Sequence, residues 1–451
     1  MSVIGQLASF VAGAKASALP GSERERLWLH FTDTVVAALA GARIPEGKAL
    51  GGLGEEASLA DRIGRRAAAI RLTEIDDIHL PSCITPSAGI VPVALMLAAA
   101  TQKFDPDEIA SAIWVGTEIM TRLGVAVAGP QILYRGIWPT YLAAPVAAAA
   151  TAARTLALSE ERTSHALSLA VMLAAGGVGR IHGAPSGRWF LYANAVAGGV
   201  AASIAARNDY RGDPTLLDKN WLADTHGIAL DSAPLLDGLG ARSVFPALSI
   251  KPFCSAKQAI AAVEAFRAIL QDEGVGHDRI AGRIAHVRVH VPAAYAGMIA
   301  TRAEPGARQS TMVSVAHQLA LAALKPERLY EVDRSSPLAE ADVAQLAAKV
   351  EVVPAPALEP FYPQHWPAEV EIVADGKTFR RRVVEARGDP EHAFGSADVD
   401  EKAHRVLDPL LGAPHVDEWL TMCHGAFNGA VECRRLTLAF ADGTAIGRGE
   451  K

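Results

Sequence analysis

The sequence contains little of what builds disulfide frameworks, zinc centres or serine hydrolase sites. Its four cysteines, Cys83, Cys254, Cys423 and Cys433, include no Cys-x-x-Cys pair. The fourteen histidines are scattered without a His-Glu-x-x-His motif, and no Gly-x-Ser-x-Gly elbow is present. We therefore predict reduced structural thiols, no metal site and no serine nucleophile.

Surplus charge and long apolar runs are scarce as well. The formal net charge is -6 over 451 residues, which argues against nucleic acid or an anionic membrane as a partner. The most apolar tracts, residues 90–100 and 143–153, are shorter than the roughly 20 residues of a membrane span. Residues 1–19 lack the basic start of a signal peptide. We expect a soluble, cytoplasmic protein without a membrane partner.

Apolar residues are plentiful, and their spacing in the first half of the chain is helical. They make up 50% of the sequence, but aromatic residues only 6%, which favours close helix–helix packing. Residues 24–40, 107–125 and 193–206 place apolar side chains on one face of a helix. Ser159 is suited to cap the helix that follows it. We predict a large helical domain.

The pattern changes near residue 284. Residues 286–291 alternate between apolar and polar side chains, and residues 370–384 have the pattern of a hairpin with an Asp375-Gly376 turn. A helical pattern returns at residue 398, although residues 435–440 resemble a strand and are ambiguous. The fold class is thus mainly α with an inserted α+β domain. We assign residues 1–262 and 398–451 to the helical domain and residues 263–397 to a smaller α/β lid domain.

Two polar loops in the helical half are candidates for chemistry. In residues 76–87, Asp76 and Asp77 precede an apolar helix, where burial would raise a carboxyl pKa and suit a general base. In residues 134–141, Arg135 could bind a carboxylate bidentately and Tyr141 could donate a proton. The alternative is that the acidic pair caps a helix or forms a turn, and that the second loop is an ordinary helix entry.

A third candidate lies where the two domains join, which is a common place for ligand clefts. Lys251 and Lys257 flank a Pro-Phe-Cys turn there, although lysines at such positions are often only surface charges. The glycines of residues 176–187 faintly suggest a phosphate-binding loop. No P-loop lysine follows them and no strand precedes them, so the signal is weak.

In their order and spacing, these segments resemble the MmgE/PrpD superfamily, which includes 2-methylcitrate dehydratase, cis-aconitate decarboxylase and iminodisuccinate epimerase. The resemblance spans nearly the whole chain and is carried by residues 31–41, 76–77, 86–87, 136–139, 251–253, 312–314, 365–368 and 388–390. It implies a helical domain from both chain ends, an α/β lid and a site between them that needs no cofactor. It also implies a small polycarboxylate substrate and a homodimer.

Several positions depart from the family pattern. Thr85 and Trp138 stand where dehydratases and decarboxylases usually have histidines. Arg188 lies in the family's Lys-Arg segment, His317 stands where a tyrosine is usual, and Lys257 lies near a usual histidine position. Two imidazoles suited to proton transfer near neutral pH are therefore missing.

The resemblance implies a role for each of these positions, including those that depart from the family pattern. The implied catalytic residues are Asp77 as base and Tyr141 or Lys251 as acid, and the implied substrate-binding residues are Arg135, Thr85, Trp138, Arg188, Lys257 and His317. An acid/base pair requires Asp77 to lie within a hydrogen bond, or one bridging water, of Lys251.

These residues lead to one main functional expectation and two alternatives. We expect a cofactor-independent lyase or isomerase that removes a proton α to a carboxylate, with cations stabilising the enolate-like charge. One alternative is an epimerase of an imino- or amino-dicarboxylate, which tolerates the missing histidines because no leaving hydroxyl has to be protonated. The other is an inactive homologue that still binds polycarboxylates.

Overall fold

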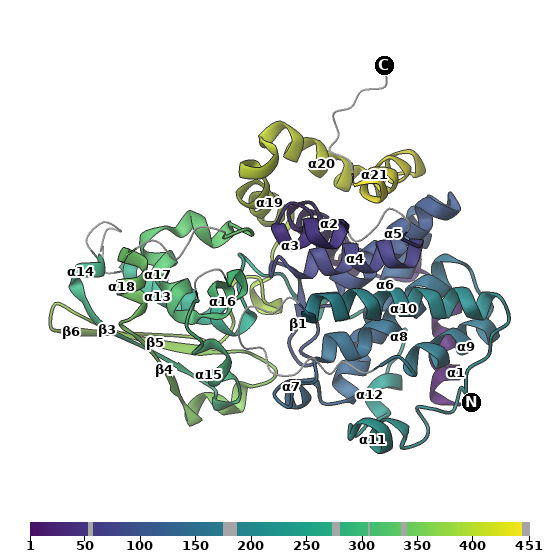
Figure 1. Cartoon of the computed structure of the whole chain (residues 1–451), viewed down its shortest axis with the longest axis horizontal. Helices are drawn as coiled ribbons and strands as arrows, with labels where there is room; N and C mark the ends of the chain where they lie inside the picture. The colour runs from purple at the N-terminus through teal and green to yellow at the C-terminus, as the bar shows by residue number, and fades with distance from the viewer. Residues whose placement is uncertain (53–56, 175–186, 273–279, 305–306, 335–340, 444–451) are drawn as a thin grey trace.

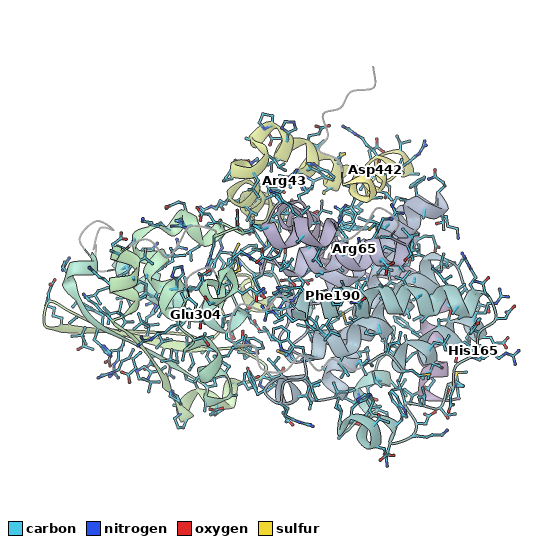
Figure 2. The ribbon with its side chains drawn as sticks, in the orientation of Figure 1. Arg43, Arg65, His165, Phe190, Glu304 and Asp442 are labelled. Carbon is cyan, nitrogen blue, oxygen red and sulfur yellow. The ribbon has the colours of Figure 1, made fainter. Side chains whose placement is uncertain are left out.

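The computed structural model describes residues 1–52, 57–174, 187–272, 280–304, 307–334 and 341–443. A large helical body and a smaller α/β body lie side by side (Figure 1). In Figure 2, His165 lies on the helical body and Glu304 on the α/β body. The predicted fold class, mainly α with an inserted α+β region, is confirmed.

The helical body consists of tightly packed helices from the first half of the chain. They are α1 (Val3–Gly13), α2 (Gly21–Gly41), α3 (Pro45–Gly51), α4 (Leu59–Arg71), α5 (Ser87–Thr101), α6 (Pro106–Ala126), α7 (Gly129–Leu133), α8 (Pro139–Thr155), α9 (Glu160–Val171), α10 (Gly187–Arg207), α11 (Trp221–His226) and α12 (Ala233–Leu236). The Ser159 side chain accepts a hydrogen bond from the Arg162 amide and caps α9, as predicted.

Small residues explain how closely these helices approach one another. Helix α8 is rich in alanine, is buried along nearly its whole length, and packs against α6 and α10. A Cβ atom on Gly199 of α10 would lie 2.2 Å from the carbonyl oxygen of Pro145, so the close contact depends on glycine. Helix α10 is long and apolar enough to cross a membrane, but 56% of its apolar window is buried against neighbouring helices, as expected of a core helix.

The α/β body contains a four-stranded sheet in the order β4-β3-β5-β6. Strand β3 (Ile284–Val291) pairs in parallel with β4 (Val350–Pro354) and antiparallel with β5 (Ala368–Ala374), and β5 forms a hairpin with β6 (Lys377–Val383). Asp375 and Gly376 have φ values of 50° and 74°, as the predicted two-residue turn requires.

Helices cover this sheet and connect its strands. They are α13 (Lys257–Asp272), α14 (Ile280–Arg283), α15 (Ala293–Ile299), α16 (Arg308–Val313), α17 (Val315–Leu324) and α18 (Ala341–Ala347), with short 3-10 turns η4 (Pro326–Tyr330), η6 (Pro356–Phe361) and η7 (Pro390–His392). Helix α13 packs against β5, β6 and α17. Residue 263, where we placed the start of the lid, lies inside this helix.

The chain then returns to the helical body through α19 (Ser396–Leu411), α20 (Ala413–Gly425) and α21 (Ala430–Asp442) (Figure 1). Helices α19 and α20 pack against α2, and α21 packs against α5. Residues 435–440, which resembled a strand, are helical. The buried residues of α21, which are Cys433, Leu436, Thr437 and Phe440, follow a helical spacing.

Candidate functional site

A pocket lies where the two bodies meet. The helical body contributes Arg71, Glu74 and Arg188 to its lining, and the α/β body contributes Met298 and Trp366. A short antiparallel pair, β1 (Ile78–His79) with β2 (Leu248–Ser249), brings the loop after α4 next to the Lys251 segment. Residues about 170 positions apart in sequence thereby share one site.

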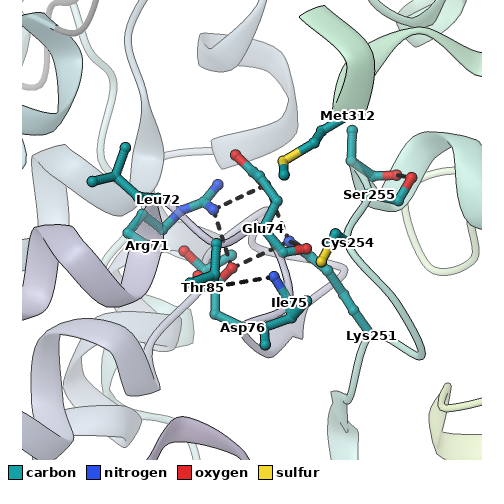
Figure 3. A network of polar contacts seen from close by, with 12 residues as sticks. Arg71, Leu72, Glu74, Ile75, Asp76, Thr85, Lys251, Cys254, Ser255 and Met312 are labelled. Carbon is teal, nitrogen blue, oxygen red and sulfur yellow. Dashed lines mark hydrogen bonds and ion pairs between the residues drawn. The ribbon is translucent and has the colours of Figure 1, made fainter. Parts of the chain in front are cut away.

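Five buried charged residues, which we call the pocket cluster, surround this junction: Arg71, Glu74, Asp76, Arg188 and Lys251. Figure 3 shows Arg71, Glu74, Asp76 and Lys251. Arg71 Nη1 lies 2.9 Å from Glu74 Oε2 and 3.1 Å from Asp76 Oδ1. Lys251 Nζ lies 3.3 Å from each of the same two oxygens. Three cations therefore face two carboxylates, which leaves one surplus positive charge in a buried place.

The two carboxylates of the pocket cluster respond differently to their surroundings. Burial acts to raise the pKa of Glu74, but the charges of Arg71, Lys251 and Arg188 outweigh it and lower that pKa to about 2. For Asp76, burial prevails over the charges of Arg71 and Lys251 and raises the pKa. Divergent pKa values of neighbouring carboxylates are typical of acid/base sites.

The backbone of Glu74 is strained. Its φ is 56°, in the left-handed region that residues other than glycine rarely adopt, at a cost of about 1 kcal/mol or more. Its carbonyl oxygen accepts hydrogen bonds from the Ser255 amide at 3.2 Å and from Lys251 Nζ at 3.4 Å. These bonds across the junction hold the Glu74 carboxylate toward the pocket.

Arg188, in the first turn of α10, is held by aromatic rings. Its guanidinium lies 3.9 Å from the ring centre of Trp189 and 5.0 Å from that of Trp138. Within the described part of the chain, its Nε and Nη2 atoms are buried and have no hydrogen-bond partner. Burial lowers the pKa of Arg188. These buried donors suit the carboxylate of a ligand.

Two family models match the chain. The MmgE/PrpD N-terminal domain matches residues 65–226, and the MmgE/PrpD C-terminal domain matches residues 253–423. The chain belongs to the MmgE/PrpD family. It is also 25% identical, over 240 residues, to the cis-aconitate decarboxylase-like protein oryM of Aspergillus oryzae. That alignment covers 49% of this chain and 50% of the relative, so the chain spans about half the length of the curated relative that it matches.

Most of the positions that the MmgE/PrpD resemblance implied lie at the pocket. Thr85, Trp138, Arg188, Lys251 and Lys257 line it. The ammonium of Lys257 lies 2.5 Å from Asp389 Oδ1, so this lysine is already paired. The ring of Tyr141 lies behind that of Trp138, with 5.3 Å between their centres. The Tyr141 hydroxyl is buried and has no hydrogen-bond partner among the described residues, and burial raises its pKa.

In the structure, Asp77 and Lys251 make their hydrogen bonds and ion pairs with different residues. Asp77 Oδ2 accepts a hydrogen bond from the Ser87 hydroxyl at 2.5 Å and lies 3.0 Å from His30 Nδ1, on the side of α2 and α5. The described lining of the pocket does not include Asp77. Lys251 pairs with Glu74 and Asp76 because the loop turns the carboxylates of neighbouring residues in different directions.

Arg135 and His317 also lie elsewhere. Arg135 is exposed and donates to the carbonyl oxygen of Gly227 at 3.1 Å, so it binds backbone instead of facing the pocket. His317 is buried in α17, where burial and the charges of Arg334 and Arg328 lower its pKa to about 4. Neither is part of the described pocket lining.

Sequence reasoning missed Arg71 and Glu74. Arg71 ends an amphipathic helix, where an arginine usually faces solvent. Glu74 lies three residues before Asp77, and the adjacent acidic pair Asp76-Asp77 was the more obvious candidate for a base. The available signal was the i, i+3 spacing of Arg71 and Glu74 at a helix end. The glycine-rich segment 176–186 lies outside the described residues.

One group of described side chains that is not part of the pocket lining could hold a metal ion. Ligand atoms of His365, Glu385 and Glu391 all lie within 4.8 Å of one another. All three side chains are partly exposed. Histidine and carboxylate ligands in this number would suit zinc or a similar ion.

Proposed function

We propose that this chain is a cofactor-independent lyase or isomerase, which binds a small polycarboxylate in the pocket and removes a proton α to one of its carboxylates. The observation that carries the proposal is the pocket cluster, in which three buried cations face two carboxylates. Membership of the MmgE/PrpD family and similarity to a protein named as cis-aconitate decarboxylase-like support the same class of reaction.

The charge balance favours an anionic ligand. An unpaired cation in a buried place is costly, so a ligand carboxylate that offsets the surplus charge would bind favourably. Arg188 is the best placed to receive it, because its Nε and Nη2 make no hydrogen bond within the described chain and Nη2 lies 3.7 Å from Glu74 Oε1. A second carboxylate of the ligand could approach Lys251, which also lines the pocket.

Glu74 is our candidate base. It lines the pocket, and a pKa of about 2 keeps it deprotonated. A ligand carboxylate close to Arg188 and Lys251 would offset part of the charge that holds this pKa low, which makes Glu74 more basic once the substrate is bound. The C–H bond then breaks, the proton moves to the Glu74 carboxylate, and the electron pair enters an enolate-like system near Arg71 and Lys251.

The fate of that intermediate defines the reaction. Loss of hydroxide would give a dehydratase, and return of the proton to the other face would give an epimerase. A decarboxylase would return the proton at another carbon, release carbon dioxide and protonate the carbanion that remains. The described pocket lining contains no histidine. Thr85 and Trp138 occupy the two positions where dehydratases and decarboxylases of the family usually have histidines. This observation favours the epimerase as the second candidate, since it needs no acid for a leaving hydroxyl.

Proton NMR in deuterated water tests the proposal. The protein is incubated with 2-methylcitrate, citrate, cis-aconitate, iminodisuccinate and aspartate-like acids, with Glu74→Gln as a matched variant. We expect one compound to lose an α-proton signal with the wild type but not with the variant, and its product identifies the branch. Binding without exchange by any of these acids would contradict the proposal and favour an inactive binding protein.

A further inference from the structure

A second buried charge pair lies behind the loop that carries Glu74. Asp33 belongs to α2, and Lys402 belongs to α19 in the returning C-terminal segment. Lys402 Nζ lies 2.6 Å from Asp33 Oδ1, and both side chains are at most 2% exposed. Neither residue is part of the described pocket lining. Burying a lysine this deeply costs desolvation energy, which ion pairs and hydrogen bonds must offset, so its bonding partners indicate its role.

The second partner of Lys402 is the backbone of the loop that carries Glu74. Its ammonium donates a hydrogen bond of 2.8 Å to the carbonyl oxygen of Ile75. Ile75 lies between Glu74 and Asp76, the two carboxylates of the pocket cluster. The Lys402 ammonium thus links the backbone of the loop that carries Glu74 to α2, because it bonds both to Ile75 and to the Asp33 carboxylate.

The rest of the loop is held from the same side. The side chain of Asp77 accepts hydrogen bonds from the amide and the hydroxyl of Ser87, and it lies beside His30 Nδ1. Burial lowers the pKa of His30, which favours a neutral ring that donates its Nδ1 proton to Asp77. The backbone at Ile75 and the side chain at Asp77 are therefore both anchored away from the pocket, while Glu74 and Asp76 turn toward the cations.

We propose that Lys402 is a positioning residue, which uses its bonds to Asp33 and to the carbonyl of Ile75 to fix the loop so that Glu74 faces the substrate. The catalytic part of this inference rests on the proposed function. The strained φ of Glu74 explains why the loop needs these bonds. A residue in the left-handed region returns to a common conformation unless its surroundings prevent it. The C-terminal helices therefore complete the site without touching the substrate.

The test compares two double variants. Asp33→Asn with Lys402→Met removes the pair without leaving a buried charge alone. The matched control is Glu118→Gln with Arg122→Met, because neither residue belongs to the described pocket lining. This pair resembles Lys402 and Asp33. Arg122 Nε lies 2.7 Å from Oε1 of the mostly buried Glu118, and Arg122 Nη1 donates hydrogen bonds to the backbone carbonyls of Pro234 and Asp237.

Two readouts are followed in both variants. Amide hydrogen exchange of residues 72–79 is expected to be on the order of tenfold faster in the Asp33/Lys402 variant and unchanged in the control. With the acid identified by the α-proton assay, kcat is expected to fall on the order of 10- to 100-fold, because small misplacements of reacting groups are costly. KM should change less than about threefold, since the cations that bind the ligand remain.

The outcomes separate this inference from the proposed function. If residues 72–79 exchange as in wild type, or if both variants loosen the whole fold equally, the role of Lys402 is overturned. If the wild type exchanges no α-proton with any acid, the proposed function fails, and the amide exchange still decides whether Lys402 fixes the loop. Should the first variant not fold, Asp33→Leu with Lys402→Leu gives the same two readouts.

Discussion

Two groups of ion pairs in this protein both contain arginine and glutamate but differ in how far solvent reaches them. The pocket cluster is buried, with Arg71 6%, Glu74 7% and Lys251 2% exposed. The second group, which we call the sheet ladder, crosses the β4-β3-β5-β6 sheet and consists of Arg288, Glu351, Glu369, Glu371, Arg380 and Arg382. Its arginines are about half exposed or more.

The difference lies in charge balance as well as in burial. In the sheet ladder three arginines face three glutamates, so the charges cancel, and water screens what remains. In the pocket cluster one positive charge is left over where water is scarce. Ion pairs of arginine and glutamate thus balance their charges on the surface in one region. In the other region they leave a buried positive charge that can bind an anion. This contrast can be tested with matched substitutions in the two groups.

Removing the candidate base should have the largest effect. Glu74→Gln keeps the size of the side chain but cannot accept the α-proton, so we expect kcat for proton exchange to fall by roughly 10²- to 10⁴-fold. The measurement is proton NMR in deuterated water. Glu369→Gln in the sheet ladder serves as the control and should retain the wild-type rate. Loss of less than tenfold in Glu74→Gln would assign the base to another residue.

Removing a cation from the pocket cluster should cost the most stability. Lys251→Met leaves two buried carboxylates with fewer partners, so we expect the free energy of unfolding to fall by about 3–5 kcal/mol. Urea unfolding measures this change. A loss below about 1 kcal/mol, as is usual for surface pairs, would show that water reaches the cluster freely.

The stability that Glu74 contributes should depend on pH. Its pKa is about 2 in the folded protein against 4.5 as the ordinary value, so its contribution is complete above pH 4.5 and is lost as the pH falls toward 2. This difference corresponds to roughly 3 kcal/mol. Urea unfolding of wild type and Glu74→Gln should therefore give a difference that shrinks as the pH is lowered from 5. A difference that stays constant would refute the lowered pKa.

Arg188 should matter for ligand binding more than for folding. Because its Nε and Nη2 make no hydrogen bond in the described structure, Arg188→Met should weaken polycarboxylate binding by roughly 10- to 100-fold, equal to one charged hydrogen bond or more. Calorimetric titration with the acid found in the exchange assay measures this. Arg135→Met, at the exposed bond to Gly227, is the matched control and should bind as wild type does. Equal losses in both variants would contradict the assignment.

The smallest effect is expected in the sheet ladder. Arg382 lies 2.8 Å from Glu369, but the arginine is 46% exposed. We expect Arg382→Met to change the free energy of unfolding by less than about 1 kcal/mol, since solvent screens such pairs. Urea unfolding beside Lys251→Met makes the comparison direct. A change as large as that of Lys251→Met would remove the distinction between the two groups.

The sequence alone determined the local structure of this protein and its family. Helical spacing, the Ser159 cap and the Asp375-Gly376 turn depend on neighbouring residues, so the mainly α fold with an inserted sheet was predictable. The sequence also indicated Lys251 and Arg188, because family motifs mark their positions.

Only the tertiary structure decided which carboxylate faces the pocket. Glu74, Asp76 and Asp77 share one irregular loop, whose sequence has no periodicity that would assign a side chain to a face. Their directions depend on partners far along the chain, such as Lys251 and Lys402, which lie 177 residues from Glu74 and 327 residues from Ile75. Such contacts form only when the helices pack, because burial of their apolar faces brings the distant charges together.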